Sequence, residues 1–193
     1  MLGTMTDMEL VAEIRAGNMA AFRTFYYRHA DRIFGVTTRI LGPNRADRED
    51  VVQEVFFQVY RSIGGFKGIS SVSTWLFRIA ANVSYSVLRR PLPSTVPISD
   101  ETTHSLESGM GGCQDARVDA RRTVKRMYEM LERLSPKNRM VFTLYEFEGL
   151  TLERIASVLE IPLYTAAARL RRSREQLMTE LTAVSARAKE EGP

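Results

Sequence analysis

The sequence predicts an all-α protein in which two helical domains are joined by a flexible linker. Apolar side chains recur at every third or fourth residue along most of the chain, as they do on the buried face of a helix. Capping residues and glycines mark where these periodic stretches begin and end. Residues 91–114 break the pattern, because they combine closely spaced prolines with Ser, Thr, Gly and few large hydrophobic side chains. We therefore expect a first domain at residues 1–90, a linker at 91–114 and a second domain at 115–193.

The composition favours a cytoplasmic protein with a mild preference for polyanions. The chain has 193 residues, enough for two small cores, and a formal net charge of +4 at pH 7. Its single cysteine, Cys113, cannot form an intrachain disulfide, so nothing indicates secretion. No apolar run is long enough for membrane insertion, and the acidic N-terminus lacks the pattern of a signal peptide.

Two helices are expected at the start of the chain. Thr6 and Glu9 have the spacing of a capping box, which predicts a short helix that ends at Gly17. Asn18 is expected to cap a second helix that runs to about Leu41. His29 in that helix has no second histidine or cysteine at ligand spacing, so we expect a surface histidine and not a metal ligand.

A third helix, at about residues 46–63, has an outward face of unusual composition. The residues expected on its buried face are Val52, Val55, Phe56, Val59 and Ile63. The residues expected opposite them are Asp50, Gln53, Glu54, Phe57 and Arg61. A phenylalanine among polar side chains indicates a protein contact, although it could also pack under a neighbouring helix. The acids could instead belong to a metal-dependent enzyme, but the Glu-x-x-His partners of a di-metal site are missing, so we expect no metal.

The helix predicted at residues 73–90 has one apolar face and one face suited to unpaired bases. Its inward residues are Leu76, Ile79, Ala80, Val83 and Val87. Its outward residues are Trp75, Arg78, Asn82, Tyr85 and Arg89, with Arg90 beside them. Aromatic rings, an amide and guanidinium groups without any acid are what a single-stranded nucleic acid site needs. The alternative is a helix end packed under another domain. The loop before it, with Lys67 and several small residues, could approach a flipped-out base, and Ser73 is the expected N-cap.

The second domain has the pattern of a helix-turn-helix. A first helix from about Asp115 is followed by one that begins at Ser135-Pro136 and ends at Gly149. Thr151 caps a short helix, a turn at residues 160–162 follows, and a basic helix begins at Leu163. The residues of that last helix expected to face inward are Leu163, Ala166, Leu170, Leu177 and Leu181. Those expected to face outward, where arginines can take phosphates or guanine, are Thr165, Ala168, Arg169, Arg172 and Gln176, flanked by Arg171. The alternative is an arginine-rich helix that only faces solvent.

Three segments carry a resemblance to a known family. They are DVVQEVFFQVYR at residues 50–61, FKGISSVSTWLFRIAANVSYSVLRR at 66–90, and the stretch from LERLSPKNR to RRSREQL at 131–177. They resemble regions 2.2, 2.3 to 2.4 and 4 of the group 4, or extracytoplasmic function (ECF), sigma factors of bacterial RNA polymerase, in the sigma-70 family. The resemblance implies a promoter-specific transcription initiation factor that is not an enzyme and has no cofactor.

The resemblance also implies a role for each outward face. The residues that would dock on the clamp coiled coil of the polymerase's largest subunit are Asp50, Gln53, Glu54, Phe57 and Arg61. Those that would contact the −10 element are Phe66, Lys67, Ser73, Trp75, Arg78, Asn82, Tyr85, Arg89 and Arg90. Those that would contact the −35 element are Thr165, Ala168, Arg169, Arg171, Arg172 and Gln176. Further implied partners are promoter DNA, the polymerase flap region and an anti-sigma factor.

The sequence departs from the family pattern at the start of the last helix. The family usually has glycine, threonine, valine, a basic residue and serine where this chain has Tyr164, Thr165, Ala166, Ala167 and Ala168. Two outward side chains able to form hydrogen bonds are thereby lost, so shape and phosphate contacts could dominate there. Glu160 also stands where the turn often has glycine. The alternative function is a stand-alone helix-turn-helix regulator whose first domain is a dimerisation or ligand module.

Overall fold

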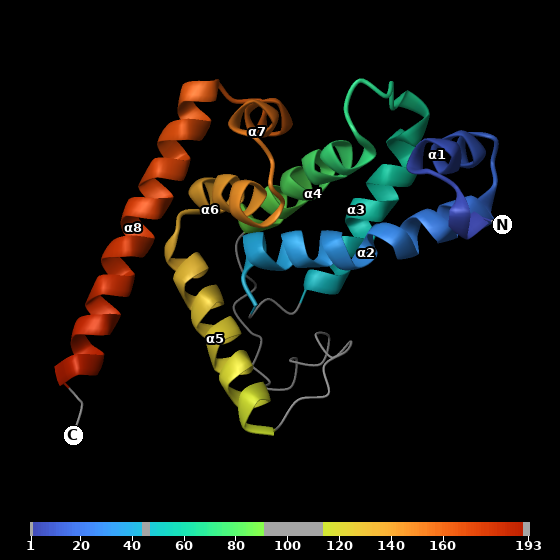
Figure 1. Ribbon diagram of the computed structural model, residues 1–193. Coiled ribbons are helices and arrows are strands. Elements are labelled where there is room, and N and C mark those ends of the chain that lie inside the picture. The colour runs from blue at the N-terminus through green and yellow to red at the C-terminus, as the bar shows by residue number, and fades with distance from the viewer. Residues whose placement is uncertain (1, 44–46, 91–113, 191–193) are drawn as a thin grey trace.

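The computed structural model describes residues 2–43, 47–90 and 114–190, and every regular element within these ranges is a helix (Figure 1). The first part of the chain forms η1 (Leu2–Thr4), α1 (Asp7–Arg15), α2 (Met19–Leu41), α3 (Arg48–Ser62), η2 (Ile63–Gly65) and α4 (Val72–Leu88). The second part forms α5 (Gln114–Arg133), α6 (Pro136–Phe142), η3 (Thr143–Phe147), α7 (Leu152–Leu159) and α8 (Leu163–Glu190). The all-α prediction is confirmed. The predicted linker lies outside the described residues, except for Gln114 at the start of α5.

Capping side chains fix the starts of several helices, mostly as predicted. Thr6 and Glu9 form the capping box of α1, and the side chain of Asn18 accepts two backbone N–H groups at the start of α2. The N-cap of α4 is Ser71, whose hydroxyl accepts from the Thr74 N–H at 3.2 Å, and not Ser73 as predicted. Helix α4 therefore begins two residues earlier than expected.

The first core lies where α2, α3 and α4 pack together, with α1 against α2. The residues predicted for the buried face of α3 are all buried there, as are Leu76, Ala80, Val83 and Val87 of α4. Phe77 and Ala81 of α4 are buried too, which the pattern of a single apolar face did not predict. A second covered face on α4 requires another element on its far side.

That element is the second half of the chain, which packs against the first. Helix α4 contacts α7, and α2 contacts α6, so one continuous hydrophobic cluster includes buried residues from both halves (Figure 1). A buried guanidinium also joins them. Arg139 on α6 is 6% exposed, and it donates to the Ile40 carbonyl oxygen of α2 at 3.2 Å and to the Glu132 and Leu134 carbonyl oxygens at 2.9 and 3.1 Å. Burial lowers the pKa of this guanidinium from its usual value.

The second half differs from the prediction in two places. The single helix expected from Ser135-Pro136 to Glu148 is α6 followed by η3, a π-helical turn. Leu163 and Leu181 of α8 are exposed and not buried as predicted, whereas Ala166, Leu170 and Leu177 are buried. Leu177 is the last α8 residue in the small hydrophobic cluster that α8 forms with α5. Leu181 lies one turn further along α8, beyond the part of the helix that contributes to this cluster.

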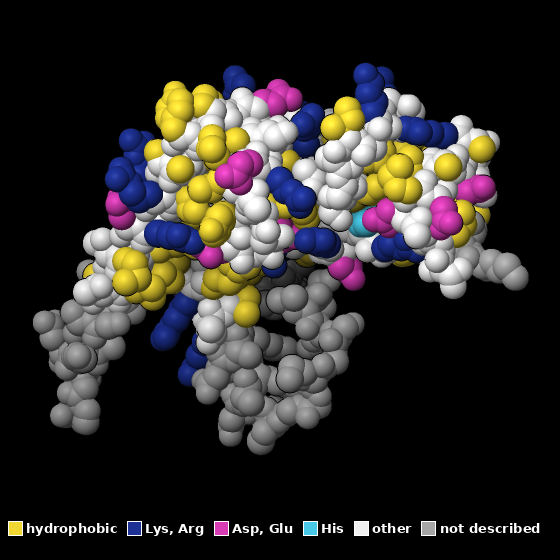
Figure 2. Space-filling model, turned by 45° about the horizontal axis from the view of Figure 1, so that its top comes forward, with side chains coloured by type: hydrophobic (Ala, Val, Ile, Leu, Met, Phe, Trp, Pro, Cys, Tyr) yellow, Lys and Arg dark blue, Asp and Glu magenta, His cyan; other side chains and the backbone are white. Residues whose placement is uncertain are grey.

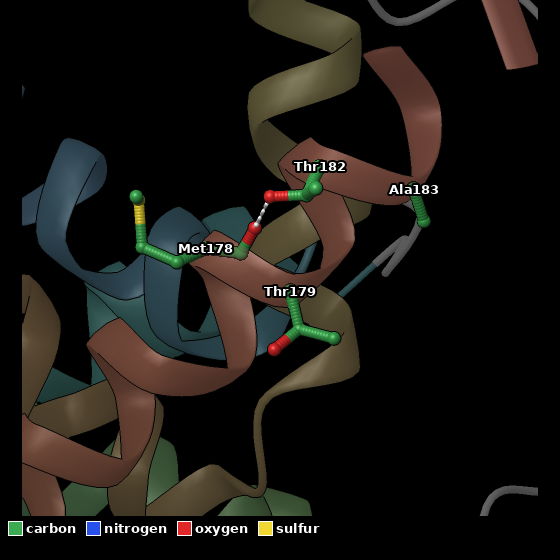
Figure 3. A pocket seen from close by; sticks show the side chains of 4 residues that line it. All are labelled: Met178, Thr179, Thr182 and Ala183. Carbon is green, nitrogen blue, oxygen red and sulfur yellow. Dashed lines mark hydrogen bonds between the residues drawn. The ribbon is translucent and has the colours of Figure 1, made fainter. Parts of the chain in front are cut away.

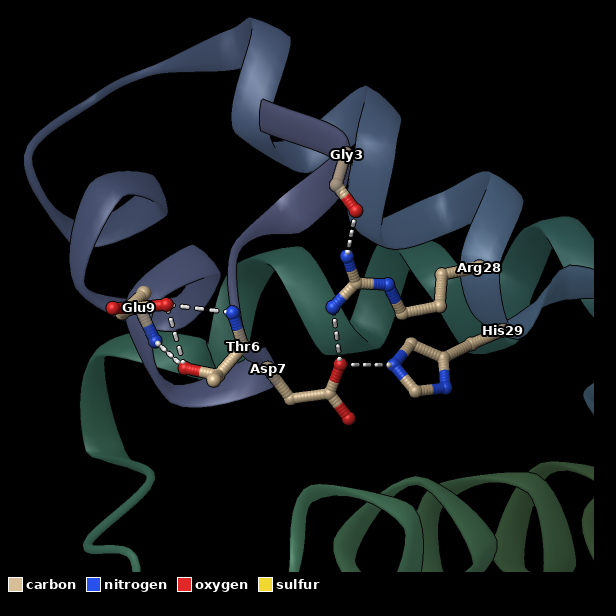
Figure 4. Close-up of polar contacts among 6 residues, drawn as sticks. All are labelled: Gly3, Thr6, Asp7, Glu9, Arg28 and His29. Atoms are coloured by element: carbon tan, nitrogen blue, oxygen red, sulfur yellow. Dashed lines mark hydrogen bonds and ion pairs between the residues drawn. The ribbon is translucent and has the colours of Figure 1, made fainter. Parts of the chain in front are cut away.

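His29 is buried, although a surface position was predicted. Its side chain packs on the Phe25 ring, with ring centroids 4.6 Å apart, and its Nε2 lies 3.2 Å from Asp7 Oδ1 (Figure 4). Arg28 donates to the same oxygen at 3.0 Å, and to the Gly3 carbonyl oxygen. Burial lowers the pKa of His29, against the opposing effect of the adjacent Asp7 carboxylate, and the nearby Arg28 and Arg32 lower it further.

The lowered pKa of His29 predicts a pH-dependent stability. The unfolded chain binds a proton at His29 near pH 6.5, whereas the folded chain resists it, so stability is complete above that pH and falls as pH decreases through it. His29→Gln should remove about 1 kcal/mol or less of this loss between pH 7.5 and 5.5. Urea unfolding followed by the fluorescence of Trp75, the single tryptophan, measures it. If the free energy of unfolding fell equally with pH in the wild type and in His29→Gln, His29 would not be the source of the pH dependence.

Candidate nucleic-acid interface

The predicted protein-docking face of α3 is open to solvent. The five residues expected on it, Asp50, Gln53, Glu54, Phe57 and Arg61, are all exposed. The Phe57 ring is 55% exposed, and the Arg61 guanidinium lies over it with its carbon 5.6 Å from the ring centroid. No helix of the described chain packs on this ring, which leaves an apolar side chain accessible among charged ones, as in the centre of a protein interface. The alternative in which Phe57 packs under a neighbouring helix is therefore wrong.

The loop between α3 and α4 is held in place from below by an aromatic pair. Phe66 is 5% exposed and packs on Trp75 with ring centroids 5.0 Å apart, while Trp75 itself is half-buried. Arg15 of α1 donates to the carbonyl oxygens of Ile63 and Phe66. The prediction that Phe66 contacts the −10 element is therefore wrong for its ring, which is already buried in the fold and cannot stack on a base. Lys67 and Ile69 in the same loop are exposed.

The outward face of α4 keeps most of its predicted groups accessible. Asn82, Arg89 and Arg90 are exposed, and Ser73 and Tyr85 are half-buried. The Arg89 guanidinium lies over the Tyr85 ring, with its carbon 6.0 Å from the centroid. The amide, one half-covered ring and two guanidinium groups thus remain available together, in the arrangement that single-stranded nucleic acid needs.

Arg78, in the middle of this face, is occupied by the second half of the chain. Its NH2 donates to the Ser157 carbonyl oxygen of α7 at 3.3 Å, and its NH1 lies 3.9 Å from Glu160 Oε1. The second half therefore covers α4 at Arg78, in the middle of the helix, and leaves Asn82 exposed. The interpretation as a site for unpaired bases stays a prediction for the exposed part of this face.

The helix-turn-helix is formed by α7, α8 and the turn between them. Thr151 caps α7, and the turn closes with the Ile161 N–H donating to the Ala156 carbonyl oxygen at 3.0 Å. Glu160 adopts a left-handed conformation, with φ of +53°, and it is the only described non-glycine residue with positive φ. Such a conformation costs about 1 to 2 kcal/mol for a residue with a Cβ.

The predicted −35 residues on α8 fall into two groups. Arg171 and Arg172 are exposed, and Arg171 pairs loosely with Glu175 at 3.6 Å. The other four, Thr165, Ala168, Arg169 and Gln176, are half-buried. Gln176 is committed elsewhere, because its Nε2 donates to the Arg133 carbonyl oxygen at 2.9 Å. Tyr164 was not predicted as a contact, yet it is 76% exposed at the start of α8.

Charge alone does not locate the interface. Basic side chains occur across the whole face shown in Figure 2 and are interleaved with hydrophobic ones.

The described residues contain no cluster of His, Cys, Asp and Glu that could hold a metal ion. A shallow hollow along α8, lined by Met178, Thr179, Thr182 and Ala183, has no charged side chain (Figure 3). None of the described helices combines the length and the apolar character that crossing a bilayer requires.

Comparison with known proteins gives a consistent result. The family model for sigma-70 region 2 matches residues 25–91, and that for sigma-70 region 4 matches residues 125–177. The chain is 32% identical over 188 residues to the RNA polymerase sigma-H factor of Pseudomonas aeruginosa, covering 92% of this chain and 94% of that one. It is 30% identical over 179 residues to the ECF RNA polymerase sigma-E factor of Haemophilus influenzae, covering 90% and 94%. The solved structure of CnrH in complex with the cytosolic domain of CnrY has the same fold, with a TM-score of 0.66, 24% identity, and 92% and 97% of the two chains covered.

The strained turn before α8 gives a direct test of the helix-turn-helix geometry. Glu160→Gly should stabilise the protein by about 1 kcal/mol and raise its melting temperature by a few degrees, because glycine adopts positive φ without strain. Thermal unfolding followed by circular dichroism measures the change. Glu160→Ala is the matched control, since it removes the same carboxylate but keeps the Cβ. A gain of equal size in both variants would show that charge, and not backbone strain, sets the effect.

Proposed function

The chain belongs to the sigma-70 family as an ECF-type sigma factor of RNA polymerase, and we propose that its two halves divide promoter recognition between them. It is a transcription initiation factor and not an enzyme. The site assignments that follow rest on which side chains the structure leaves accessible. The exposed face of α4 around Asn82 is the observation that carries them.

The face of α3 around Phe57 docks on the core polymerase. The Phe57 ring is exposed in the free chain and becomes the apolar anchor that is buried in the complex. The polar rim around it consists of Asp50, Gln53, Glu54 and Arg61. The clamp coiled coil of the largest subunit is the partner of this face. The location of such a complex is the cytoplasm, where the polymerase acts.

The face of α4 captures unpaired bases of the −10 element. Asn82 supplies donors and acceptors for a base edge, the exposed edges of Trp75 and Tyr85 supply stacking surface, and Arg89 and Arg90 hold the backbone. Stacking contributes about 1 to 3 kcal/mol per base, so one or two captured bases offset the opening of a few base pairs. The binding is selective for opened strands, because these groups cannot reach bases inside a duplex. The polymerase supplies the rest of the opening.

Helix α8 contacts the −35 duplex, mainly through Arg171 and Arg172. Tyr164 extends this surface at the start of the helix, where the family usually has glycine. With alanines at the following positions, phosphate contacts and DNA shape dominate over base contacts. Two weak contacts on one chain become specific when the polymerase lets both engage at once. An anti-sigma factor that covers these surfaces keeps the factor inactive until it is released.

The division of labour predicts different defects for two variants. Asn82→Ala should leave core binding intact but reduce open-complex formation about 5- to 100-fold, which corresponds to losing about 1 to 3 kcal/mol of base contact. The double variant Asp50→Ala, Phe57→Ala should weaken core binding about 30-fold or more. Permanganate reactivity of unpaired thymines and run-off transcription measure the first effect, and a fluorescence titration with core polymerase measures the second.

Ser86→Ala is the matched control for Asn82→Ala. Ser86 lies one turn further along α4, is exposed, and has no role in the proposed interface. It should open promoters as the wild type does. If the Asp50/Phe57 variant bound core polymerase normally, the assignment of α3 would be wrong, and equal open complexes with and without Asn82 would remove the assignment of α4.

A further inference from the structure

Two arginines on α2 hold a buried carboxylate from the other half of the chain. Glu148, just after η3, has a side chain that is 5% exposed. Its Oε2 accepts from Arg32 Nε at 2.7 Å, and its Oε1 accepts from Arg39 NH1 at 3.2 Å. Arg32 and Arg39 lie seven residues apart and so project from one face of α2, two turns from each other. The carboxylate bridges them.

Each guanidinium is fixed in place by its surroundings. The Arg32 guanidinium lies over the Phe77 ring of α4 at 4.9 Å, and that of Arg39 lies over the Phe147 ring at 4.5 Å. A Cβ at Gly35, between them on α2, would stand 3.3 Å from Arg39 NH1, so the missing side chain leaves room for this guanidinium. Phe77 stays beside Arg32 when the halves separate, so this guanidinium is already oriented and loses little freedom when an anion binds, whereas Phe147 leaves Arg39 with the second half.

This geometry suits a phosphate as well as a carboxylate. Two guanidinium groups directed at two oxygens of one anion are the usual way in which proteins bind phosphate. Arg32 also touches α4, the helix of the predicted −10 surface, through the Phe77 ring. Arg78 is itself covered by Ser157 and Glu160 of the second half. The second half therefore places two acids over three arginines of the first.

We propose that Arg32 and Arg39 form a site for a DNA backbone phosphate next to the −10 surface, and that Glu148 occupies it in the closed chain. The inference rests on the proposed function, because it takes DNA as the ligand. When the halves separate, Glu148 leaves and a phosphate replaces it, so each arginine exchanges one anion for another. In the closed chain the Glu148 contact keeps DNA away from Arg32 and Arg39. The carboxylate acts as an internal competitor of the nucleic acid.

The test uses the full chain and a fluorescein-labelled single-stranded DNA of 15 nucleotides and mixed sequence, at low salt and without polymerase. Glu148→Gln keeps the shape of the side chain but removes the charge that holds the arginines. It should bind this DNA about 5- to 10-fold more tightly than the wild type in a fluorescence anisotropy titration. The triple variant Glu148→Gln, Arg32→Gln, Arg39→Gln should lose that gain.

Glu146→Gln is the matched control for charge. Glu146 pairs with Arg174 within the second half, at 2.7 Å, so its removal changes net charge equally without freeing α2. It should bind DNA as the wild type does. Circular dichroism confirms that each variant is folded.

Three outcomes would overturn the proposal: no gain for Glu148→Gln, the same gain for Glu146→Gln, or a gain that survives loss of both arginines. Run-off transcription by the wild-type chain with core polymerase tests the proposed function separately. If the wild-type chain supports transcription but Glu148→Gln does not bind DNA more tightly, the sigma factor assignment stays intact and only the proposed phosphate site is wrong.

Discussion

The closed arrangement of the chain depends on a buried guanidinium that needs both halves. Arg139 of α6 finds one carbonyl acceptor on α2 and two at the end of α5, with almost no access to water. A buried charge without acceptors is costly, so the two halves are held at a defined distance and not merely in loose apolar contact. If the halves separate, water can replace the Ile40 acceptor, but the apolar side chains that the two halves share also become exposed. An interface of this kind is specific in geometry, because the guanidinium finds all three carbonyl acceptors only when α2 and α6 are correctly placed.

The helices could be predicted from the sequence because their signals are local. The capping box at Thr6, the cap at Asn18 and the apolar face of α3 each depend on residues within a few turns, and the structure has all three. The errors arise where distant elements decide. Ser71 and Ser73 are equally good caps in isolation, and Phe77 and Ala81 are buried on a helix that packs against α2, α3, α6 and α7 together. Helical periodicity describes a helix with one buried face, and α4 has two.

The site shows the same division. The exposed positions of Phe57, Asn82, Arg171 and Arg172 follow from helical spacing, whereas the burial of Phe66 follows from its contact with Trp75 across a loop. Arg32, Arg39 and Glu148 gave no signal in the sequence, because each looks like an ordinary surface charge in its own helix. They acquire a role only when residues more than a hundred positions apart meet. Tyr164 was visible as a departure from the family pattern, and its exposure now gives that departure a physical meaning.

The π-helical turn η3 sets the direction in which the residues after it point. A turn of this type holds one residue more than an α-helical turn, so every position that follows is rotated by about 100° relative to an uninterrupted helix. Glu148, the residue directly after this turn, meets Arg32 and Arg39 of α2. A single-residue deletion in this segment would restore the α-helical register and turn Glu148 away from the two arginines of α2. The length of this one turn therefore decides whether a carboxylate of the second half meets Arg32 and Arg39.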